Sequence, residues 1–117
     1  MEFEVEDNRG SDYWIDHDIE FCVYANNKWI DSFLATCQGA LLSKTRAKFS
    51  WHIADYELSL KTNTTNKLSL TIEAYQLDER WDGTQDPKMF PVVASHKTDL
   101  KLYYESHIFG KNVLEIK

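Results

Sequence analysis

The chain has 117 residues, a net charge of −6 and a hydrophobic content of 43%, which suit one globular domain with its own core. The acidic balance argues against nucleic acid or an anionic membrane as direct partner, because both need clustered Lys and Arg. No apolar run is long enough for a transmembrane helix, and the acidic N-terminus lacks a signal-peptide pattern. We therefore expect residues 1–117 to form a single cytoplasmic domain, with Cys22 and Cys37 as reduced, buried thiols rather than a disulfide.

Alternating apolar and polar residues predict two strands near the N-terminus. Phe3 and Val5 alternate with glutamates, which indicates a short strand over 2–6 that suits a sheet edge. A hairpin is expected over 18–33, where Asn26-Asn27 supplies two residues that tolerate the positive φ of a tight turn.

Residues 32–48 are the one candidate helix in the chain. Apolar residues recur there at helical spacing, Ser32 is a suitable cap, and basic residues follow at the C-terminal end. Gly39 lies in the middle and costs about 1 kcal/mol relative to Ala. The alternative is that the strand continues to Cys37 and turns at Gln38-Gly39.

The clearest pattern in the chain is a hairpin over 56–75. Leu58 and Leu60 alternate with polar residues, and after the turn at 62–66 the alternation resumes through Leu68, Leu70, Ile72 and Ala74. Another strand is expected at 49–53, just before this hairpin.

The C-terminal part of the chain combines a long loop with further strands. Residues 78–91 form the loop, and strands are expected at 91–96, 99–104 and 113–116. The fold class is therefore mainly antiparallel β, a sandwich or strongly curved sheet of about seven or eight strands with an optional helix near 32–48. An α+β fold is the alternative.

Clusters of ligand-type side chains do not assemble into a recognisable catalytic or metal site. Asp16-His17-Asp18 and the Asp82–Asp86 segment are read as solvated acidic loops, because neither has the spacing of a metal site. The histidines at 52, 96 and 107 lack the spacing of a zinc helix, and no nucleophile elbow or phosphate-binding loop occurs. We expect a protein that is not an enzyme and binds no cofactor or metal.

Charge and aromatic residues point to protein binding. Residues 1–20 carry eight acidic residues against Arg9 alone, and the 78–86 loop adds more carboxylates. Trp29 and Trp51 are expected in the core. Trp14 and Trp81 lie in acidic loops, either as anchors for a cationic surface or as lids over the sheet ends.

The favoured hypothesis is a small acidic protein that neutralises a basic protein partner, such as a nuclease with a cationic cleft. Bacterial immunity proteins and phage-encoded inhibitors have this size and charge. The predicted binding residues are Asp12, Tyr13, Trp14, Asp16, His17, Asp18, Asp78, Glu79, Trp81, Asp82 and Asp86. The alternatives are a carbohydrate- or small-ligand-binding β-sandwich, and a structural subunit that adds the strand at 2–6 or 113–117 to a neighbour's sheet.

Overall fold

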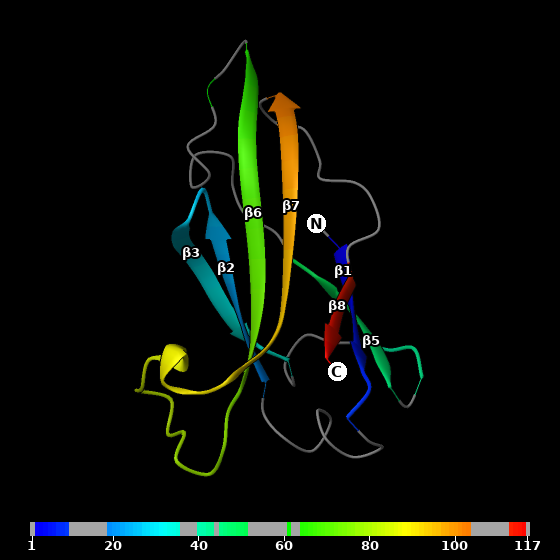
Figure 1. The fold of residues 1–117 in the computed structure, drawn as a ribbon, viewed down its shortest axis with the longest axis vertical. Helices are drawn as coiled ribbons and strands as arrows, with labels where there is room; N and C mark the ends of the chain where they lie inside the picture. The colour runs from blue at the N-terminus through cyan, green and yellow to red at the C-terminus, as the bar shows by residue number, and fades with distance from the viewer. Residues whose placement is uncertain are drawn as a thin grey trace.

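The computed structural model describes residues 2–9, 19–35, 40–43, 45–51, 61, 64–103 and 113–116. These residues form eight strands and one 3₁₀ turn (Figure 1). The elements are β1 (Glu2–Asp7), β2 (Ile19–Ala25), β3 (Lys28–Leu34), β4 (Ala40–Leu41), β5 (Arg46–Ser50), β6 (Thr65–Gln76), η2 (Pro87–Met89), β7 (Val92–Tyr103) and β8 (Val113–Ile116).

The strands form two four-stranded sheets that pack as a sandwich. Sheet A has the order β4-β5-β1-β8, and sheet B has the order β3-β2-β6-β7. All pairs are antiparallel except β1 with β8, which run parallel. The mainly antiparallel β class predicted from the sequence is thus confirmed.

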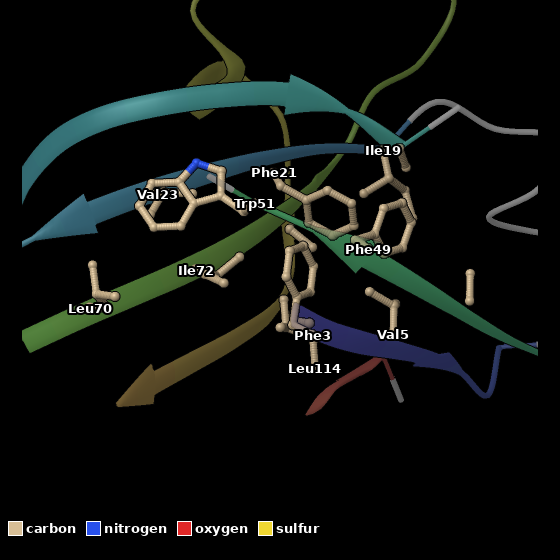
Figure 2. Close-up of a cluster of buried hydrophobic side chains, with 14 of the residues drawn as sticks. Phe3, Val5, Ile19, Phe21, Val23, Phe49, Trp51, Leu70, Ile72 and Leu114 are labelled. Carbon is tan, nitrogen blue, oxygen red and sulfur yellow. The ribbon is translucent and has the colours of Figure 1, made fainter. Parts of the chain in front are cut away.

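One apolar cluster fills the space between the sheets. Alternate residues of β2 face inward, as do alternate residues of β1, β5, β6 and β8. The Phe21 ring of sheet B meets two rings of sheet A, with centroids 5.3 Å from Phe3 and 4.9 Å from Phe49 (Figure 2). Burial of such side chains is worth about 1.5–3 kcal/mol each before entropy is counted.

Two polar contacts stabilise the sandwich at its margins. The Trp51 Nε1–H group donates to Asp31 Oδ2 at 2.8 Å and so joins the residue after β5 to β3 in the other sheet. Asp7 is fully buried at the end of β1, and the Arg9 guanidinium donates to both of its carboxylate oxygens at 3.0 and 2.8 Å. This pairing compensates a charge that would be costly in the interior.

The predicted turn at Asn26-Asn27 is confirmed. Both asparagines have positive φ, 49° and 67°, and they connect β2 to β3 as the two central residues of a tight turn. The Asn26 side chain also accepts a hydrogen bond from the Ser69 backbone N–H at 3.0 Å. The turn is thereby attached to β6.

The hairpin expected over 56–75 is described only in its second half. That half is β6, whose even-numbered residues are buried as predicted, whereas residues 52–60 lie outside the described part. The Asn66 amide bonds both to the N–H and to the C=O of Lys61, at 2.8 and 2.9 Å. Lys61 and Asn66 therefore lie side by side at the two ends of the segment where the turn was predicted.

Three predictions about local structure are wrong. The described residues of the range 32–48 do not form the predicted helix: β3 extends to Leu34, and β4 and β5 follow. The N-terminal strand does not lie at a sheet edge, because β5 and β8 pair with its two sides. The two strands expected at 91–96 and 99–104 are one continuous strand, β7, which is paired with β6 along its length.

Candidate partner-binding surface

The acidic N-terminal strand is largely neutralised by its neighbour in the sheet. Glu2, Glu4 and Glu6 face outward from β1, opposite basic residues of β5. Arg46 Nε lies 2.5 Å from Glu6, and Lys48 Nζ lies 3.1 Å from Glu2. The excess of carboxylates in residues 1–20 is therefore not a free acidic patch where the structure describes it.

Six of the predicted binding residues lie outside the described part of the chain. They are Asp12, Tyr13, Trp14, Asp16, His17 and Asp18. The other five belong to the segment that connects β6 to β7, which the sequence correctly predicted to be a long loop. They are Asp78, Glu79, Trp81, Asp82 and Asp86.

The loop between β6 and β7 is held by hydrogen bonds to its own carboxylates. Arg80 bonds to Asp78 and lowers the pKa of that carboxyl. Asp82 accepts from the Thr84 hydroxyl and N–H, which likewise lower its pKa, and Asp86 caps η2 through the Lys88 N–H. These bonds fix the shape of the loop, while its four carboxylates (Asp78, Glu79, Asp82 and Asp86) stay exposed.

Trp81 is half-buried and packs on the loop itself. Its ring meets the Phe90 ring edge-on at 5.8 Å, and the Arg80 guanidinium lies 5.4 Å from the centre of that same ring. Phe90 is itself buried. Trp81 is thus packed on its own loop rather than fully exposed, and its role as an anchor or a lid stays a prediction.

Trp29 is the exposed tryptophan of the described residues, contrary to the prediction that it belongs to the core. Its exposed fraction is 53%, against 3% for Trp51, which is buried as predicted. A bulge explains the difference, because Asp31 pairs with Val23 whereas Trp29 pairs with Tyr24 and Ile30 is skipped. The bulge reverses the alternation of β3, so Trp29 lies on the outer face of sheet B.

The outer face of sheet B beside the loop carries buried polar side chains. Glu20, Cys22 and Tyr24 alternate along β2, and the register places Glu73 and Tyr75 of β6 next to them. The Tyr75 hydroxyl donates to Glu73, and burial raises the pKa of Tyr75. Burial, with nearby carboxylates, raises the pKa of Cys22 to about 12, so this thiol is a poor nucleophile.

Glu20 is the least compensated of these groups. Its exposed fraction is only 7%, and its Oε2 atom has no hydrogen-bond partner among the described residues. Burial raises the pKa of Glu20, partly offset by the Ser32 hydroxyl and reinforced by the charge of Asp86. A buried acceptor without a hydrogen-bond donor destabilises the folded state, so a ligand that supplies a donor to Glu20 would be bound favourably.

A pocket of about 250 Å³ lies between this face and the loop. Its walls are Cys22, Trp29, Ser32, Asp86, Pro87 and Lys88. Lys88 directs its ammonium group over the Tyr24 ring, 5.2 Å from the ring centre. We call Trp29 together with Asp78, Glu79, Asp82 and Asp86 the acidic loop surface.

The opposite end of sheet B has the opposite charge. Lys67 and Lys101 lie directly across from each other on β6 and β7, and Lys97 lies on the same face, in the row that runs through Thr71 and Tyr24 to Trp29. All three are exposed, and the carboxylate of Asp99 lies between them along β7. The carboxylates are therefore concentrated in the loop and the lysines towards the far end of this face, and Trp29 lies between them, level with Lys97.

The described ranges hold neither a cluster of metal ligands nor a membrane-spanning helix. No three His, Cys, Asp or Glu side chains in these ranges gather as metal ligands would, and His96 instead contacts the Thr98 hydroxyl at 3.0 Å. His52 and His107 lie outside the described ranges. No helix in these ranges has the length and apolar character needed to cross a membrane.

Comparisons with known proteins add no family to this description. Neither protein-family models, nor curated proteins, nor solved structures give a match to the chain.

Sequence reasoning found the loop carboxylates but missed Trp29, Glu20 and Ser32. One signal was present in the sequence: Asp31 shares the odd-numbered phase of Trp29 and Phe33, and an Asp in an apolar stripe is typical of a register change.

Proposed function

We propose that this chain is a small acidic, non-enzymatic binding protein that attaches to a basic protein partner through the acidic loop surface. The observation that supports this most is Trp29, a large aromatic residue that is more than half exposed beside a loop with four exposed carboxylates. Tryptophan is the residue type most enriched at energetic centres of interfaces, and rim carboxylates steer a cationic partner toward it.

The loop is well suited to present these charges in a fixed arrangement. Its carboxylates are oriented by bonds within the loop, so little conformational entropy is lost when a partner binds. A partner whose own ligand is a polyanion, such as a nuclease, offers the complementary cationic cleft. In that case binding would block the cleft, and the chain would act as an inhibitor in the manner of an immunity protein.

The alternative functions have less support. A carbohydrate-binding sandwich predicts several exposed tryptophans on one face, but in the described residues Trp51 is buried and Trp81 packs on Phe90. For a structural subunit, addition of the 2–6 strand to a neighbour's sheet is disfavoured, because β1 already has neighbours on both sides. Addition of the 113–117 strand stays a prediction, because β8 lies at the edge of sheet A.

The test is affinity capture from a lysate of the source cell, at low salt and at about 0.5 M, where the screening length falls to a few ångströms. The baits are the wild type, the Glu79→Gln/Asp82→Asn variant and a matched control. The control, Asp99→Asn/Glu115→Gln, removes two exposed carboxylates far from the loop. Both variants change the net charge equally.

We expect one basic protein, identified by mass spectrometry, to bind the wild type and the control at low salt only. The loop variant should lose it. Equal capture by both variants, capture that persists at 0.5 M salt, or capture without any basic protein would contradict the proposed function.

A further inference from the structure

The pocket beside Trp29 has the dimensions of a site for one side chain. Its volume of about 250 Å³ lies below the range of about 300–1,000 Å³ that is usual for sites of whole small-molecule ligands. It opens on the outer face of sheet B, and two of its lining residues, Trp29 and Asp86, belong to the surface that the proposed function assigns to the partner. A side chain that projects from a partner is therefore a better occupant than a free metabolite.

The walls of the pocket select for a cation with several hydrogen-bond donors. Trp29 supplies an aromatic face and Asp86 supplies a carboxylate. Glu20 adjoins the wall, because it lies two residues from Cys22 on the same face of β2 and interacts with the Ser32 hydroxyl. Its buried Oε2 atom has no described partner. Carboxylates only accept hydrogen bonds, so a donor must supply the missing one.

The chain's own Lys88 shows that this face accommodates a positive charge. Its ammonium group lies over the Tyr24 ring, at the margin of the same pocket. A guanidinium fits the remaining walls better than a second ammonium, because it is planar, stacks on an aromatic ring and directs donors to two carboxylates at once. The ammonium group of Lys88 would then repel the guanidinium group that enters the pocket.

We infer that this pocket receives an arginine side chain of the partner, which stacks on Trp29 and donates to Glu20 and Asp86. The inference rests on the proposed function and specifies the group that the partner inserts. It also identifies Glu20, a buried residue that surface charge alone would overlook, as a determinant of specificity.

The probe is N-acetyl-arginine amide, titrated into the ¹⁵N-labelled full chain and followed by amide NMR. N-acetyl-citrulline amide is the matched neutral probe, since it has nearly the same shape without the charge. We expect the arginine probe to shift the Trp29 indole N–H and the Ser32 and Lys88 amides, with citrulline at least about tenfold weaker. Glu20→Gln should weaken arginine binding about tenfold, whereas Lys88→Met should strengthen it and Asp99→Asn should leave it unchanged.

Several results would overturn the inference. They are the absence of shifts at these residues, equal binding of arginine and citrulline, equal affinity of wild type and Glu20→Gln, or a response to a monosaccharide instead of arginine. The unaffected amides of each variant report whether its fold is intact. If the arginine probe fails while the loop variant still loses the captured protein, the pocket inference is wrong and the proposed function stands. If the probe binds but capture is unaffected by the loop substitutions, the proposed function is wrong.

Discussion

Replacing Trp51 by alanine should destabilise the protein far more than the same change at Trp29. Trp51 is almost fully buried, and a core Trp→Ala change costs about 3–5 kcal/mol. Loss of its N–H group also leaves Asp31 Oδ2 without this donor, which costs about another 1–3 kcal/mol. The sum of about 4–8 kcal/mol is large against the total of about 6–18 kcal/mol expected from 0.05–0.15 kcal/mol per residue.

Trp29 loses much less on truncation because water fills the vacated place and no cavity forms. About half of its surface is covered, which corresponds to about 1–2 kcal/mol. Urea unfolding followed by far-UV circular dichroism separates the two variants. With a slope of about 2 kcal/mol/M, the midpoint should fall by about 2 M or more for Trp51→Ala and by about 0.5–1 M for Trp29→Ala.

The variant Trp51→Phe keeps a ring in the core but removes the donor to Asp31. Its loss should be about 1–3 kcal/mol, well below that of Trp51→Ala. Equal midpoints for Trp29→Ala and Trp51→Ala would refute the assignment of one tryptophan to the surface and the other to the core.

Three further substitutions test single contacts. Arg9→Met should cost about 3–5 kcal/mol in thermal unfolding, because it leaves the buried Asp7 charge uncompensated, and a loss below about 1 kcal/mol would show that the pair contributes little. Asn27→Val should cost about 1–2 kcal/mol in urea unfolding because φ is +67° there, whereas Asn27→Gly should be close to neutral; similar losses for both would contradict a steric origin. Burial raises the pKa of Glu20, so the folded state binds the carboxyl proton of Glu20 more tightly than the unfolded state does. The stabilisation that results is fully present below pH 4.5, the ordinary pKa, and is lost as the pH rises through the raised pKa of the folded state. Glu20→Gln should therefore raise the melting temperature at pH 7 relative to its effect at pH 4, and the opposite order would contradict this sign.

Much of the fold was predictable because alternation reports directly on burial. The stripes of β1, β2 and β6 each place apolar residues on one face, and the Asn-Asn pair specifies the only kind of turn that suits two positive φ values. The helix predicted over 32–48 failed because Phe33, Cys37 and Leu41 recur at helical spacing by coincidence. In the structure Phe33 instead pairs with Phe21 across the sheet, with ring centroids 5.4 Å apart.

The candidate site was harder to predict, since it depends on register and on contacts between distant segments. The loop carboxylates were visible in the sequence, but a single skipped residue in β3 moves Trp29 from the core to the surface. Glu20 belongs by sequence to the acidic N-terminal segment. Only the pairing of β2 with β3 brings it to Ser32, and only the fold of the loop brings Asp86 near.

The parallel pairing of β1 with β8 has a consequence for biosynthesis. Asp7 lies opposite Ile116, 109 positions later in the chain, so β1 has an open side until residues 113–116 have left the ribosome. The other neighbour of β1, β5, is synthesised much earlier. Pairing between strands that lie as far apart in the sequence as β1 and β8 slows folding to the native topology. Until then the nascent chain displays an unpaired strand bordered by apolar side chains, which is a binding site for chaperones and a point of entry for aggregation. Sheet A is therefore expected to close only after synthesis of its final strand.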